Sequence, residues 1–199
     1  MSHAHLWVGT KSHVMGNMKE QTIVSILGIA LLVWWISSGK ANVKQIESDV
    51  QLMERLAEPW VGFPNKEKNN SAIYMNLSSF LTTTKAMTRE IQEVFPDMTP
   101  TQLQRYLLDS LTQVAQETDL FAKLVHKADF EVSSGDSFVD GPFEISTQTE
   151  IQDLEMIIGL MFKVLQRARD VAVELLNKVG THPQAISQMT GPLDALLPL

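Results

Sequence analysis

Apolar residues recur at alternating steps of three and four residues in four long segments that follow residue 40. Such steps place the apolar side chains of each segment on one stripe of an α-helix. A repeat that averages about 3.5 residues favours shallow, left-handed packing between long helices, as in a coiled coil. The helices are expected near residues 42–58, 71–95, 100–128 and 147–179. We therefore predict an all-α fold in which residues 40–190 form an antiparallel bundle of about four long helices.

Residues that favour helix ends separate these segments. Thr99 followed by Pro100 fits a cap with proline at the first helical position. Thr147 and Glu150 have the T-x-x-E spacing of a capping box. The second and third helices are joined by residues 96–99 alone, so we expect them to be antiparallel neighbours.

A second apolar line in the last segment indicates a helix with two neighbours, as inside a bundle. A two-stranded rod would need one line only. We expect this helix to end near Gly180, where a left-handed residue is favoured, with Pro183 beyond the end. The second line consists of Ile157, Leu160, Val164 and Val171.

An uncharged run precedes the bundle. As a helix, residues 22–38 would span about 25 Å at ~1.5 Å per residue, the short end for crossing a bilayer. The nine Ile, Leu and Val residues of this run favour insertion by about −3 to −5 kcal/mol. We predict a single transmembrane helix here, after a short N-terminal segment, residues 1–21. Its anchor residues are Ile23, Ile26, Leu27, Leu31, Leu32, Trp34, Trp35 and Ile36.

Two other interpretations of this run are a signal peptide cleaved after Ala41 and a buried core helix. The region before the run is long for a signal peptide, and the stretch from Ile26 to Ile36 has no polar face for a core helix. Lysines on both sides leave the positive-inside rule undecided. We expect a cytoplasmic N-terminus in a bacterial inner membrane, with the bundle in the periplasm, because residues 1–21 are too few to fold.

Composition limits the chemistry. The chain has no cysteine, which excludes disulfides, thiolate zinc sites and cysteine nucleophiles. Its formal charge of −7 argues against wrapping a nucleic acid. Neither His126 nor His182 has the glutamate three residues earlier that di-metal bundles use, and no glycine-rich phosphate loop is present. We expect no catalytic residue, no cofactor and no metal site, and hence not an enzyme.

The acidic stretch 129–146 leaves one metal question open. Asp136, Asp140, Gly141 and Glu144 fall at positions 1, 5, 6 and 9 of a calcium-loop template. Positions 3 and 12 do not match, so the sequence neither predicts nor excludes calcium binding.

Alternating apolar residues in the same stretch are compatible with a small β-hairpin between the last two helices, turning at Ser134–Gly135. A projecting hairpin is a candidate partner-docking element. Its candidate contact residues are Phe138 and Phe143. The alternative is a loop whose phenylalanines cap the core.

Two further segments are candidates for contact with a partner. The loop after the first helix carries Trp60 and Phe63, which either contact a partner or form a lid on the bundle. The tail, residues 191–199, is apolar, although tails are usually polar. It either folds back or inserts into a partner through Leu193, Leu196, Leu197 and Leu199.

These features favour a non-enzymatic, single-pass, membrane-anchored structural or assembly subunit of a larger membrane protein complex. Secretion, pilus and energy-transducing machines contain scaffold subunits with this organisation. The expected partners are the lipid bilayer and other protein subunits, and not nucleic acid. The alternative is an extracytoplasmic helical-bundle module that binds or senses a ligand, although no second span is present to return a signal.

Overall fold

The structure, a computed structural model, describes residues 42–61, 70–93 and 98–194. These residues belong to one compact unit, Ala41–Leu199. The secondary-structure elements are a first helix over residues 42–61, α2 (Ala72–Glu93), α3 (Pro100–Ser133), β1 (Phe138–Asp140), β2 (Phe143–Ile145), α4 (Gln148–Lys178) and α5 (Pro183–Asp194). The predicted all-α bundle, with a small hairpin between its last two long helices, is confirmed.

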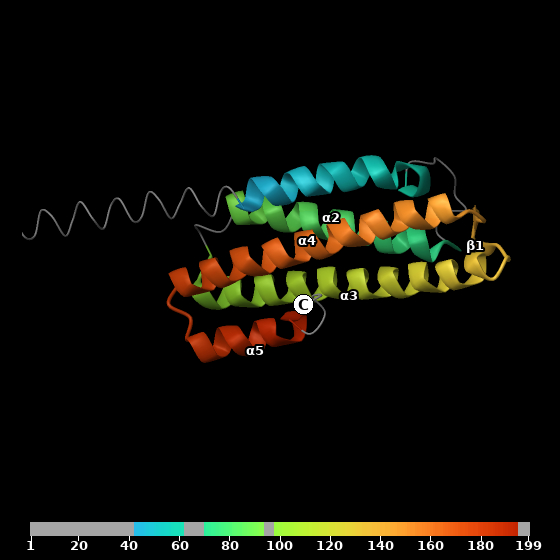
Figure 1. Cartoon of the computed structure of the whole chain (residues 1–199). Coiled ribbons are helices and arrows are strands. Elements are labelled where there is room, and N and C mark those ends of the chain that lie inside the picture. Colours follow the sequence, from blue (N-terminus) through green and yellow to red (C-terminus); the bar gives the residue numbers. More distant parts are fainter. Residues whose placement is uncertain (1–41, 62–69, 94–97, 195–199) are drawn as a thin grey trace, which may run out of the picture. The chain divides into compact units, whose positions relative to one another are not determined.

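The four long helices alternate in direction along the chain (Figure 1). α3 packs against α2 on one side and α4 on the other. Polar pairs join the first helix to α2, where Gln92 Nε2 donates to Glu47 Oε1 at 2.8 Å and Lys85 is paired with Glu54. Asp49 of the first helix forms an ion pair with Arg167 of α4. The first helix therefore lies between α2 and α4 and closes an up-down-up-down bundle.

The predicted apolar stripes face one another in the core. Both apolar lines of α4 are buried, as expected for a helix with two neighbours. Burying one Val, Leu, Ile, Phe or Met side chain stabilises the fold by about 1.5–3 kcal/mol. Stripe residues with no solvent exposure include Ile46, Met53, Leu77, Phe80, Leu107, Phe121, Leu154 and Leu165.

Capping boxes begin α3 and α4. The Thr147 hydroxyl accepts the N–H of Glu150 at 3.3 Å, and the Glu150 carboxylate accepts the N–H of Thr147 at 3.0 Å. Hydrogen bonds from the Thr147 hydroxyl and from the N–H groups of Ser146 and Thr147 lower the pKa of Glu150. Thr99 and Gln102 form the equivalent box at the start of α3.

The hairpin turns at Gly141–Pro142, so the expected turn at Ser134–Gly135 is wrong. Gly135, with φ +90°, instead follows the end of α3, where its N–H donates to the carbonyl of Val132 at 3.1 Å. Asp140 pairs with Phe143 across the hairpin, which leaves a two-residue loop. Gly141 has φ +61°, as the first loop position of a type II′ turn requires.

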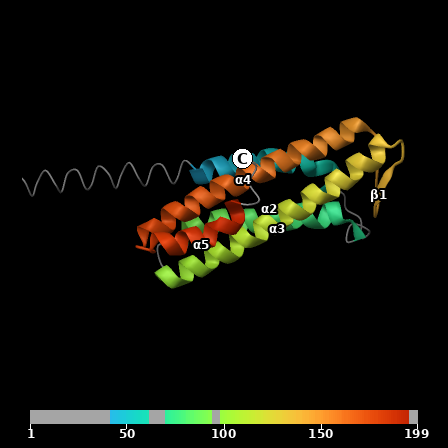
Figure 2. The ribbon, with the colours of Figure 1, turned by 60° about the horizontal axis from the view of Figure 1, so that its bottom comes forward.

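The sequence did not predict α5. Pro183 stands at its first position and does not merely follow the end of α4. The His182 Nδ1 accepts the N–H of Gln184 at 3.3 Å. Ile186 and Thr190 are buried, and α5 packs along α3 and α4 (Figure 2).

None of the helices in the described part of the chain is long and apolar enough to cross a membrane. The predicted N-terminal segment and transmembrane helix lie outside the described residues, as do all eight anchor residues from Ile23 to Ile36.

Candidate functional site

The most distinctive surface lies at the end of the bundle that carries the hairpin. We call it the hairpin end and define it as residues 128–156, which comprise the last turns of α3, the hairpin and the first turns of α4. Its sequence contains eight aspartates and glutamates and no lysine, arginine or histidine. The first helix begins at the opposite end of the bundle (Figure 1).

Asp140 holds the hairpin against the N-terminus of α2. Its carboxylate accepts the hydroxyl of Ser71 at 2.7 Å, the N–H of Ala72 at 3.0 Å and the N–H of Ile73 at 2.8 Å. The Ser71 hydroxyl in turn accepts the N–H of Tyr74 at 3.0 Å. A carboxylate at this position also interacts favourably with the positive end of the helix dipole. Asp140 is therefore a helix cap supplied from a distant part of the chain.

Gly141 permits this close approach. A Cβ atom at this position would lie 3.1 Å from the carbonyl carbon of Asn70 and 3.2 Å from the nitrogen of Ser71. No larger residue fits there without displacing the backbone. The turn glycine and the capping carboxylate together fix the hairpin on the bundle.

The hairpin has a buried and an exposed face. Phe138 and Ile145 form the cross-strand pair that faces the core, whereas Val139 and Glu144 form the pair that faces solvent. Strand residues alternate between faces, so the buried pair determines which side chains are presented outwards. Val139 is 64% exposed.

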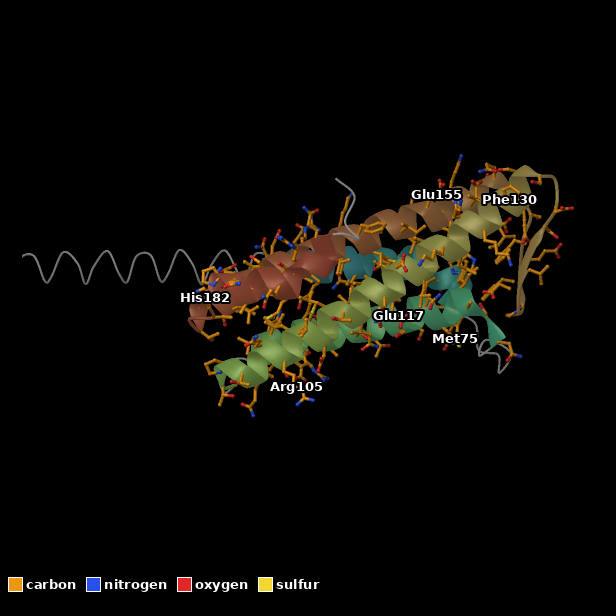
Figure 3. The ribbon with its side chains drawn as sticks, turned by 90° about the horizontal axis from the view of Figure 1, so that it is seen from below. Met75, Arg105, Glu117, Phe130, Glu155 and His182 are labelled. Atoms are coloured by element: carbon orange, nitrogen blue, oxygen red, sulfur yellow. The ribbon has the colours of Figure 1, made fainter. Side chains whose placement is uncertain are left out.

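Phe130 adds a larger apolar side chain at the same end. It lies on the last turns of α3 and is 71% exposed, more than any other large apolar residue in the described part of the chain. Met156, on α4, is half exposed. Figure 3 shows Phe130 on α3 and Glu155 on α4 near the hairpin.

Three of the eight acidic side chains here, Asp129, Asp140 and Glu150, accept hydrogen bonds from neutral groups. Asp129 accepts from Ser133 at 3.2 Å and from Gln148 at 3.0 Å, and Asp140 and Glu150 are bonded as described above. Such bonds satisfy a carboxylate without cancelling its charge. Among the described residues, one salt bridge involves this end, and it joins Glu131 to Lys127 at 3.8 Å. The Lys127 ammonium also lies over the Phe138 ring, 5.4 Å from its centre.

Three of the residues predicted to contact a partner have side chains in the described part of the chain, and none of the three is exposed. Trp60 and Phe138 are buried, and Phe143 is partly buried against the core. These three aromatic side chains pack against the protein's own core, and their contact with a partner stays a prediction. Phe63 and the side chains of Leu193, Leu196, Leu197 and Leu199 lie outside the described residues.

The calcium-loop match does not assemble a cation site in the described part of the chain. Asp140 is turned toward α2, while Glu144 points outward from the hairpin. The described residues contain no group of three or more histidines, aspartates or glutamates that could hold a metal ion. Of the two histidines considered, His126 is exposed on α3 and His182 caps α5 at the opposite end.

Polar residues also line a groove of about 480 Å³ between the first helix and α2. The groups on its two sides pair with each other, through Glu47 with Gln92 and Glu54 with Lys85. Unlike residues 128–156, the lining of this groove therefore contains charges of both signs, namely Glu47, Glu54, Lys85 and Arg89.

Sequence reasoning missed the residues that matter most here. Phe130 lies off the apolar stripe of its helix. This position was the one signal in the sequence that could have identified it as an exposed aromatic residue. The capping role of Asp140 had no local signal, because its partner Ser71 lies 69 residues away in the chain.

No protein-family model matches the chain, and comparisons with curated proteins and with solved structures found no match. The functional proposal therefore rests on the residues of this chain.

Proposed function

We propose that this protein is a non-enzymatic, single-pass, membrane-anchored structural or assembly subunit of a larger membrane complex, with its helical bundle in the bacterial periplasm. The observation that carries the proposal is the uncharged run from Ile23 to Ile36, which ends with Trp34 and Trp35 shortly before the helical domain begins. Tryptophans are favoured at the membrane interface, so their place in the run fits an anchor.

The bundle supports a role in binding other subunits. Its most exposed large apolar side chains among the described residues, Phe130 and Val139, are at the hairpin end. Exposed apolar side chains on a soluble surface mark sites of protein contact when they gather at one place.

Membrane extraction and purification test this proposal. The full chain, expressed in a bacterium, is expected to stay in the membrane pellet after alkaline carbonate washing, whereas a variant lacking residues 22–38 is expected in the supernatant. Purified in a mild detergent, the full chain is expected to run as a complex larger than its 22.3 kDa mass, with companion chains in constant proportion. Release of the full chain by carbonate would refute the anchor, and a monomer without companions would refute the subunit role.

A further inference from the structure

The charge of the protein is concentrated at the hairpin end. Residues 128–156 carry eight acidic residues and no basic one, a formal charge of −8, while the whole chain carries −7. The difference, −7 minus −8, leaves +1 for all other residues together. The excess negative charge of the sequence therefore lies within residues 128–156, and Lys127, directly before them, pairs with Glu131.

The same end presents the most exposed apolar side chains of the described residues. Phe130 and Val139 are 71% and 64% exposed. They come from α3 and β1, which are in contact with each other at the hairpin end. A surface that has exposed apolar side chains among charges of one sign is complementary to a partner that has apolar side chains and charges of the opposite sign.

From the exposed apolar side chains of Phe130 and Val139 and the exposed carboxylates of Asp136 and Glu144 at this end, we propose that the hairpin end binds a positively charged amphipathic segment of another subunit. The inference deepens the proposed function, on which it rests, by naming the chemistry of the partner. Lysines and arginines of the segment pair with the exposed acids Asp136 and Glu144, and its apolar face covers Phe130 and Val139. An amphipathic helix has both features at the required spacing.

Charge also disfavours the other occupants. A second copy would bring another −8 to the same surface, and like charges across an interface oppose association. The chain's own tail, residues 191–199, contains one aspartate and no basic residue. An anionic lipid surface would repel this end in the same way.

A defined peptide tests the proposal with the full chain in phosphatidylcholine nanodiscs. The probe is a fluorescent helical peptide of about 14 residues with leucine on one face and lysine on the other. Fluorescence anisotropy measures its affinity, and empty nanodiscs give the background. We expect binding that weakens as salt rises from about 50 to 300 mM, because screening reduces the attraction. A matched leucine–glutamate peptide is expected not to bind.

Paired variants locate the site. Phe130→Ser with Val139→Thr, and separately Asp136→Asn with Glu144→Gln, are each expected to weaken binding by about tenfold or more. The matched controls are Leu52→Ser with Leu120→Ser, at exposed apolar positions on the first helix and α3, and Glu93→Gln with Asp109→Asn, at exposed acidic positions elsewhere. The controls are expected to bind as the unaltered protein does. Far-UV circular dichroism confirms that each variant remains helical.

Several results would overturn the proposal. They are unchanged affinity in both hairpin-end variants, equal binding of the leucine–glutamate peptide, and self-association that the hairpin-end variants abolish. A rise in affinity after Lys66→Gln with Lys68→Gln would identify the chain's own 62–69 connection as the occupant and would also overturn it. The carbonate extraction tests the membrane anchor independently of this surface. If carbonate releases the chain and the chain still binds the peptide, the membrane anchor is refuted and the binding surface is not.

Discussion

At the scale of single residues, the core contains one hydroxyl whose removal should strengthen the fold. Thr84 is fully buried, and its Oγ1 has no hydrogen-bond partner among the described residues. Burying an unpaired hydroxyl costs about 1–3 kcal/mol. Thr84→Val keeps the shape of the side chain and removes the hydroxyl. We expect it to raise the free energy of unfolding by about 1 kcal/mol, measured by thermal unfolding of the full chain in a zwitterionic detergent.

Thr118 provides the matched control for this prediction. It is equally buried, but its hydroxyl donates to the carbonyl of Val114 at 2.8 Å. Thr118→Val removes a satisfied hydroxyl, so no gain in stability is expected. An equal gain in both variants would show that the unpaired state of Thr84 is not the cause.

The contrast between Thr84 and Ile157 shows what sequence reasoning can reach at this scale. Ile157 lies on the predicted second apolar line of its helix, Thr84 lies among the buried residues of α2, and both are fully buried. Helical periodicity is a local property, so it predicts which residues point inward. Whether a buried polar group finds a partner depends on neighbouring helices, and no spacing within one helix reveals this.

At the scale of elements, the hairpin and α2 should stabilise each other through Gly141. Gly141→Ala would place a Cβ 3.1 Å from the backbone of Asn70 at φ +61°, and we expect a loss of about 1–2 kcal/mol. Because displacement of the turn moves Asp140, the amides of Ala72 and Ile73 should exchange faster with deuterium. Mass spectrometry of the exchanged full chain measures this effect.

Gly159→Ala in α4 is the control, since nothing lies within 4 Å of the added methyl group. A helical glycine replaced by alanine is expected to gain about 0.5–1 kcal/mol. Unchanged exchange at the start of α2 in Gly141→Ala would contradict the coupling between hairpin and helix.

The first helix is joined to α4 by an ion pair that is sheltered from solvent. Asp49 is 8% exposed, is paired with Arg167, and also accepts from Gln45 at 3.3 Å. Removing one member leaves the other unpaired in a partly dry site, so Asp49→Ala should cost about 3 kcal/mol. The double variant Asp49→Leu with Arg167→Met should recover most of this loss. Urea unfolding of the full chain measures all three proteins.

An exposed ion pair is the appropriate comparison. Lys123 and Asp119, at 2.6 Å on the surface of α3, should contribute less than about 1 kcal/mol. If Asp49→Ala were as mild as Asp119→Ala, the pair with Arg167 would not hold the first helix in place.

Elements differ in how far the sequence predicts them. The long helices were predictable because each repeats its apolar stripe over many turns, as α3 does from Leu103 to Ala128. The position of the hairpin turn was not predictable. Gly135 and Gly141 both have a left-handed backbone, and only tertiary contact shows which of them ends a helix and which forms the turn. α5 was missed because Pro183 fits both the end of one helix and the start of the next.

At the scale of the whole molecule, the absence of cysteine from the sequence allows the proposed orientation to be tested directly. Any engineered cysteine is then the one reactive thiol in the chain. Ser137 is exposed beside the hairpin, so Ser137→Cys should fold normally and report where the bundle lies. If the bundle is periplasmic, a maleimide that cannot cross the inner membrane should label it in intact cells.

The N-terminal segment supplies the opposite probe. Ser12→Cys precedes the predicted span, and a cytoplasmic position predicts labelling only after the inner membrane is broken. A single pass through the bilayer requires the two cysteines to behave oppositely, because the chain between them crosses the membrane once. The reversed pattern would place the bundle in the cytoplasm while keeping the anchor. Labelling of both cysteines in intact cells, or of neither, would exclude a single-pass chain, so the pair of measurements separates topology from orientation.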